Sequence, residues 1–197
     1  MILHNPNNFS PVSSLSSPTP IMQKGDPLSI AASIIAIIQL SASVIGYNRA
    51  ASNGDDKVVD ALMQHDADVN KQGQDGGTAL HWAASNGVDK VVHLLLQHDA
   101  DMDKQDEDGQ TALHRAAVNG HDKVVELLVL HDADVNKQGE YGGTALQHAA
   151  VNGHDKVVDL LLQHDANVNK QDEDGQTALH LAAKNGHDKV VDLLRHK

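Results

Sequence analysis

The chain has 197 residues, of which 27 are acidic and 15 are basic, so its formal net charge is −12. It contains no cysteine, which excludes disulfides, thiolate metal sites and cysteine nucleophiles and favours a reducing, cytoplasmic location. Lysine and arginine never form a run, so the composition argues against a nucleic-acid partner.

The first segment, residues 1–27, holds all five prolines of the chain together with clusters of Asn and Ser. It shows neither helical nor strand periodicity, and this composition is typical of segments that cannot bury a core. We therefore predict a disordered head over residues 1–27.

The second segment, residues 28–47, carries no charge and consists mostly of Ile, Ala, Leu and Val. Asp26 and Pro27 are typical residues at a helix start, so the pattern predicts an apolar helix over residues 28–44. Three interpretations compete: a helix buried as a cap on the following repeats, a membrane-associating helix, and a signal peptide. The length just suffices for a bilayer, but four Ser and one Gln interrupt it, and 27 mostly polar residues precede it. We favour the buried cap.

From residue 45 onward the chain repeats itself every 33 residues. The motifs "TALHWAASNG", "TALHRAAVNG", "TALQHAAVNG" and "TALHLAAKNG" begin at residues 78, 111, 144 and 177. Each unit predicts a short helix, a break at Asn-Gly, a second helix with an i, i+3, i+4 apolar stripe, and a polar hairpin. One unit is too small to bury its apolar faces alone, whereas stacked units bury them together. The sequence predicts an all-α repeat solenoid with units at 45–72, 73–105, 106–138, 139–171 and 172–197.

These motifs resemble the ankyrin repeat, whose pattern is approximately G-x-T-P-L-H-x-A-A-x-x-G-H-x-x-V-V-x-x-L-L-x-x-G-A-D-V-N. The resemblance covers about three quarters of the chain. It implies a stack of helix pairs with projecting hairpins that binds other proteins through the hairpin tips and the concave face. It also implies that the chain is not an enzyme and needs no cofactor.

Two departures from this pattern are regular. Aspartate replaces the usual Gly after the second helix, which predicts a left-handed backbone at Asp66, Asp99, Asp132 and Asp165. The hairpins alternate as "GQDGG", "DEDGQ", "GEYGG" and "DEDGQ", which indicates that a block of two repeats was duplicated.

The regular histidines and the acidic hairpins are candidates for metal chemistry. Equivalent residues of stacked repeats lie about 10 Å apart, too far to share one zinc ion, and no tight His pair is apparent. We therefore predict structural roles, and no metal site, for His81, His114 and His180 and for the series His65, His98, His131 and His164. The acidic stretch from Asp99 to Asp108 lacks the Gly and Glu spacing of a calcium loop, and we interpret it as solvated hairpin charge.

The apolar opening has a resemblance of its own. "GDPLSIAASIIAIIQLSASVIGY" resembles the start of the N-terminal helical domain of fungal NLR-like proteins, a group related to the HeLo-like domains. The resemblance ends at Tyr47, where the repeats begin, so the later helices of such a domain are absent. It implies an alternative function: a truncated NLR-like signalling protein whose apolar helix acts at a membrane.

The favoured prediction is a non-catalytic, monomeric ankyrin scaffold that binds a protein partner. Its contacts are expected at the variable positions of the first helices and at the hairpin tips. Trp82, Arg115 and Tyr141 are of the types most often found as binding hot spots, although Trp82 has a second interpretation, in which it only covers the inner groove. The predicted contact residues are Trp82, Ser85, Arg115, Val118, His148, Val151, Leu181 and Lys184 on the first helices, and Gln74, Glu107, Glu140, Tyr141 and Glu173 at the hairpin tips.

Overall fold

The structure of the protein is a computed structural model that describes residues 44–64, 67–139 and 141–197. The predicted disordered head and the predicted apolar helix up to residue 43 lie outside the described residues, as do His65, Asp66 and Glu140. The interpretations that depend on these residues therefore stay predictions.

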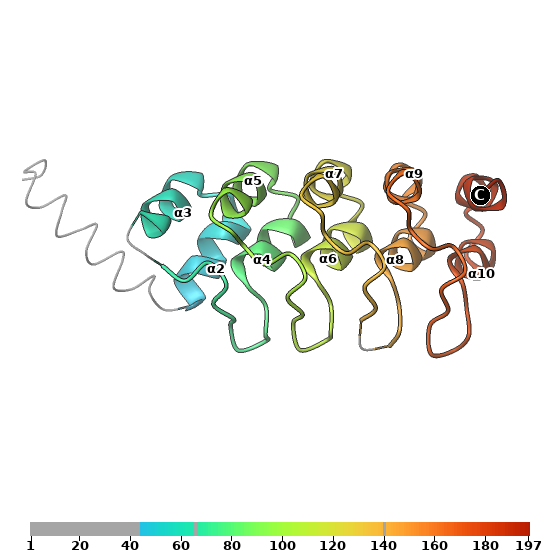
Figure 1. Cartoon of the computed structure of the whole chain (residues 1–197), viewed down its shortest axis with the longest axis horizontal. Helices are drawn as coiled ribbons and strands as arrows, with labels where there is room; N and C mark the ends of the chain where they lie inside the picture. The colour runs from blue at the N-terminus through green and yellow to red at the C-terminus, as the bar shows by residue number, and fades with distance from the viewer. Residues whose placement is uncertain (1–43, 65–66, 140) are drawn as a thin grey trace, which may run out of the picture. The chain divides into compact units, whose positions relative to one another are not determined.

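Consecutive pairs of helices make up the regular structure of the described ranges (Figure 1). From α4 onward, equivalent helices begin 33 residues apart, so the predicted all-α repeat solenoid is confirmed. Within the same ranges, no helix combines the length and the apolar character that a membrane span requires. The pairs are α2 (Val44–Asn53) with α3 (Asp56–Met63), α4 (Ala79–Ser85) with α5 (Asp89–Gln97), α6 (Ala112–Asn119) with α7 (Asp122–Leu130), α8 (Ala145–Val151) with α9 (Asp155–Gln163), and α10 (Ala178–Lys184) with α11 (Asp188–Arg195).

The first helices form one layer and the second helices form another, and the hairpins project on the side of the first helices (Figure 1). Helix α4 packs against α2, α6 and its own partner α5, while α5 packs against α3 and α7. Alanine pairs lie at the contacts between first helices, and Ala83, Ala84, Ala116 and Ala117 are fully buried. Because these side chains are small, neighbouring helices approach closely, which explains how a chain with few aromatic residues builds a core.

Each first helix from α4 onward begins after a threonine with an extended backbone. The backbone N–H of Thr111 donates to Nδ1 of His114 over 3.2 Å, and the Thr111 hydroxyl lies 2.8 Å from the same nitrogen. The other ring nitrogen, Nε2, lies 3.2 Å from the carbonyl oxygen of Gly143 in the next hairpin. One histidine therefore caps its own helix and joins two repeats, which confirms its predicted structural role.

The turn between the two helices of a repeat contains a glycine in the left-handed region. Gly120 has a φ of 72°, and a Cβ added there would lie 2.6 Å from Nδ1 of His154 in the next repeat. Nε2 of the same ring lies 3.1 Å from the carbonyl oxygen of Val118. These contacts form a further histidine series between repeats that the sequence analysis did not assign. Its other members are His121 over Gly87 and His187 over Gly153.

The second helices end in the left-handed backbone that the aspartates predict. The φ angles are 58° at Asp99, 67° at Asp132 and 59° at Asp165, which confirms the prediction at these three positions. The fourth position, Asp66, lies outside the described residues. Residues with a side chain adopt this conformation at a cost, so each of the three sites carries local backbone strain.

The first repeat departs from the others at its start. Ile45 stands where later repeats have the capping threonine, and it lies within α2. Asn48 replaces the capping histidine, and its Nδ2 donates to the carbonyl oxygen of Gly77 over 3.3 Å. Asn48 thus keeps the link to the next hairpin, the role of His81 in the following repeat.

Candidate protein-binding surface

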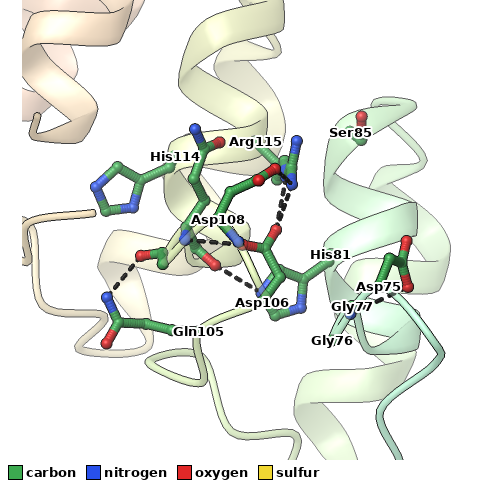
Figure 2. Close-up of polar contacts among 12 residues, drawn as sticks. Asp75, Gly76, Gly77, His81, Ser85, Gln105, Asp106, Asp108, His114 and Arg115 are labelled. Carbon is green, nitrogen blue, oxygen red and sulfur yellow. Dashed lines mark hydrogen bonds and ion pairs between the residues drawn. The ribbon is translucent and has the colours of Figure 1, made fainter. Parts of the chain in front are cut away.

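A cleft of about 200 Å³ lies between two neighbouring hairpins and the first helices α4 and α6 (Figure 2). Hairpin residues form its rim, and side chains of the two helices form its wall. Four carboxylates and one guanidinium line it, so its fixed charge is strongly negative. The lining residues are Asp75, Gly77, His81, Trp82, Ser85, Asp106, Glu107, Asp108 and Arg115.

A partly buried ion pair joins a helix side chain to the hairpin that lines the cleft. Nε of Arg115 donates to Oδ2 of Asp106 over 2.9 Å, and Nη2 donates to the same oxygen and to Oδ2 of Asp108 (Figure 2). Oδ1 of Asp106 accepts from the backbone N–H groups of Asp108 and Gln110. Burial alone would lower the pKa of Arg115, but the hydrogen bonds and charge of Asp106, followed by those of Asp108, raise it.

The interpretation of this acidic stretch as solvated charge is wrong for Asp106. Its side chain is 2% exposed, against 63% for that of Asp108. A carboxylate can be buried here because Arg115 and two backbone donors replace its hydration. Arg115 therefore has a structural role in addition to its predicted place on a binding surface.

A hydrogen-bonded glutamine series holds the hairpins at a fixed spacing. Nε2 of Gln105 donates to the carbonyl oxygen of Gly109 in its own hairpin over 2.6 Å (Figure 2). It also donates to the carbonyl oxygen of Gln138 in the next repeat over 3.0 Å. The backbone N–H of Glu107 also donates to the carbonyl oxygen of Asp75 over 3.2 Å. The rim of the cleft is therefore anchored, although the side chains of Asp75 and Glu107 are exposed. Gln72 and Gln138 repeat the pattern.

Trp82 lines the cleft together with Arg115 and is half-buried. Its indole Nε1 is inaccessible to solvent and has no hydrogen-bond partner among the residues that the structure describes. Buried polar groups are almost always hydrogen-bonded, so this donor is an exception that calls for an explanation. The nearby Gly77 leaves room beside the ring, because a Cβ there would lie 3.2 Å from Nε1.

His81 in the cleft and His114 in the next repeat are held in the neutral form. Burial is the main cause that lowers the pKa of His81, and burial followed by the neighbouring His148 lowers that of His114 to about 4. The rings of His114 and His148 lie 5.6 Å apart in an edge-to-face arrangement. The expectation that no tight His pair exists is therefore wrong, because the two residues meet from adjacent repeats. Within the described ranges, no three His, Asp or Glu side chains are placed so that they could hold a metal ion together.

The predicted contact residues fall into two sets. Trp82, Ser85, Glu107 and Arg115 come together in the cleft. The others lie elsewhere on the first helices and hairpins. His148 packs against His114, and the carbonyl oxygens of Val118 and Val151 accept from histidines of the following repeat. Leu181 is half-buried, Lys184, Gln74, Glu173 and Tyr141 are exposed, and Glu140 lies outside the described residues.

Sequence reasoning missed four polar residues of the cleft: Asp75, His81, Asp106 and Asp108. A signal for two of them was present in the duplicated block. Tyr141 stands in the second copy where the first has Asp75, and Gln147 stands where the first has His81. Asp106 and Asp108 are identical in both copies, so only the contact with Arg115 identifies them.

A family model describing ankyrin repeats in three copies matches residues 48–139 and again residues 131–197. The match covers most of the chain and coincides with the stack of helix pairs and hairpins, so the chain belongs to the ankyrin repeat family. No curated protein matches it. The family match starts at residue 48, and the resemblance of the preceding segment to fungal NLR-like proteins finds no support in these comparisons.

Proposed function

We propose that the protein is a non-catalytic scaffold that binds a protein partner on the side of its first helices and hairpins. Ankyrin repeats generally mediate protein–protein interaction, and the chain belongs to this family. The observation that carries the proposal is the cleft, because four of the predicted contact residues line it together. A cytoplasmic location and a monomeric state are part of the proposal and rest on the sequence.

The anchoring of the cleft supports a binding role. Its rim is held by hydrogen bonds between hairpins, and Asp106 fixes the position of Arg115. A rigid surface loses little conformational entropy when a partner binds, so more of the contact energy appears as affinity. Trp82 and Arg115 are also the residue types that contribute most to protein interfaces.

Affinity capture with the full chain tests the proposal. In the test variant, Trp82→His is combined with Ser85→Val, which introduces the side chains that the duplicated repeat carries as His148 and Val151. His148 and Val151 occupy the equivalent positions of α8, a helix of the same length as α4, so the variant is expected to fold. We expect it to lose at least about tenfold in partner capture, since a central aromatic contact contributes 2 kcal/mol or more.

The control variant is His93→Asp on α5, in the other helix layer. The aspartate is the residue that the duplicated block carries at the equivalent position, Asp159, whose carboxylate accepts from Gln163 over 2.8 Å. His93 is exposed and bonds Gln97 in the same way. Capture should be retained in this variant. Loss of capture with His93→Asp, or full capture with the Trp82 and Ser85 double variant, would contradict the proposal.

A further inference from the structure

We infer that the cleft beside Trp82 is a pocket for a cationic side chain, an arginine or lysine of the partner segment. The inference rests on the proposed function and specifies the chemistry of its partner. Three observations carry it: where the duplicated blocks differ, which charges line the cleft, and which groups in it are free to bond.

The duplicated blocks differ most at the cleft. Residues 73–131 and 139–197 align at a step of 66 residues, and 16 of the 59 aligned positions differ. Five of these sixteen are among the nine residues that line the cleft. Asp75, Trp82 and Arg115 become Tyr141, His148 and Leu181 in the second copy. The two copies share one backbone plan, so these replacements alter the surface and leave the fold unchanged.

The charge of the cleft selects a cation. Asp75, Asp106, Glu107 and Asp108 supply four negative charges, and Arg115 supplies one positive charge that Asp106 and Asp108 already bind. Burial lowers the pKa of His81, so this ring adds no compensating charge at neutral pH. A carboxylate ligand would meet a net negative wall, whereas a guanidinium or ammonium group is attracted to it.

The groups left free in the cleft match an arginine or lysine within a peptide. The carboxylate of Glu107 makes no ion pair or hydrogen bond among the described residues, and that of Asp75 accepts a single weak bond, from Gly77 N over 3.3 Å. Both can accept from a guanidinium or an ammonium group. The indole of Trp82 lines the same cleft, and an aromatic ring binds a cation through its face.

The chain contains a single tryptophan, so its indole N–H resonance reports on this cleft alone. The experiment titrates the full, isotope-labelled chain with a blocked pentapeptide that carries one arginine between Gly and Ser residues. A second peptide carries citrulline, the uncharged analogue of arginine. We expect a saturable shift of the indole resonance with the arginine peptide, and binding at least about fivefold weaker with the citrulline peptide.

A pair of charge-matched variants localises the effect. Asp75→Asn with Glu107→Gln removes two charges from the cleft, and should weaken binding of the arginine peptide about fivefold. Glu126→Gln with Asp192→Asn removes two charges from exposed positions of α7 and α11 in the other helix layer, and should leave binding within about twofold.

Three results would each overturn the inference: no saturable shift, equal binding of the citrulline peptide, or unchanged binding in the variant of Asp75 and Glu107. Its failure is distinguishable from failure of the proposed function. If the arginine peptide does not bind, but the Trp82 and Ser85 double variant still loses partner capture, the scaffold function stands and the cationic pocket is refuted.

Discussion

Replacing one left-handed aspartate by glycine should stabilise the protein. Asp132 has a φ of 67°, and its side chain accepts no hydrogen bond among the described residues. The left-handed conformation costs an ordinary L-residue about 1–2 kcal/mol, and Asp tolerates it somewhat better. Glycine removes this cost but loses about 0.5–1 kcal/mol through the greater freedom of the unfolded chain.

The negative charge of Asp132 adds a second, smaller term. It follows the C-terminal end of α7, where the helix dipole is negative, and removing it gains about 0.3 kcal/mol at an exposed site. The net expectation for Asp132→Gly is a gain of about 0.5–1 kcal/mol in the free energy of unfolding. Changing Asp99 and Asp165 as well should give about 1.5–3 kcal/mol, since separate sites add.

Urea unfolding followed by far-UV circular dichroism measures these values, with the slope m checked for constancy. Asp132→Asn is the matched control, because it removes the charge and keeps a side chain, so its gain should be smaller than that of Asp132→Gly. A lower unfolding midpoint for Asp132→Gly would refute the reasoning, and would show that the aspartate makes a local bond that the fold needs.

Further predictions concern pH, the turn glycines and the opening segment. The pKa of His114 in the folded chain is about 4, below its value in the unfolded chain, so up to about 3 kcal/mol of stability is lost as the pH falls from 6.5 through 4. The variant His114→Gln introduces the residue that the next repeat carries as Gln147, and urea unfolding should show a weaker dependence of its stability on pH. Gly120→Ala should lower the free energy of unfolding by about 1 kcal/mol more than Gly186→Ala, because both glycines have a positive φ but only a Cβ at Gly120 meets a histidine of the next repeat. Equal losses in the two variants would contradict this. Deletion of residues 1–44 should lower the stability of the repeats. In cosedimentation with lipid vesicles, the full chain should remain in the supernatant. Vesicle binding that requires residues 1–44 would favour the membrane alternative.

The repeat fold could be predicted from the sequence because its cause is periodic. The 33-residue step locates both helices of each unit, and the aspartates after the second helices predict the left-handed turns. A period also shows which residues are equivalent. It does not show which side chain of one repeat reaches the next, and for this reason the contact of His154 with Gly120 was missed.

The candidate site was predicted in part, for a related reason. Trp82, Ser85 and Arg115 stand out because they vary between otherwise similar repeats. Asp106 does not vary, and its burial depends on Arg115, nine residues along the chain, which folds back over the hairpin. A carboxylate in a run of acidic residues resembles solvated charge until its partner is located in three dimensions.

Site-specific photo-crosslinking tests the central claim, that a partner protein docks on the hairpin side, most directly. A photoreactive amino acid is placed in the full chain at Ser85, within the cleft, or at Gln97, which is exposed on α5 in the other helix layer. We expect one discrete protein adduct from position 85 that is absent from position 97 and that the Trp82→His variant loses. An adduct from position 97 alone, or the same adduct from both positions, would contradict it.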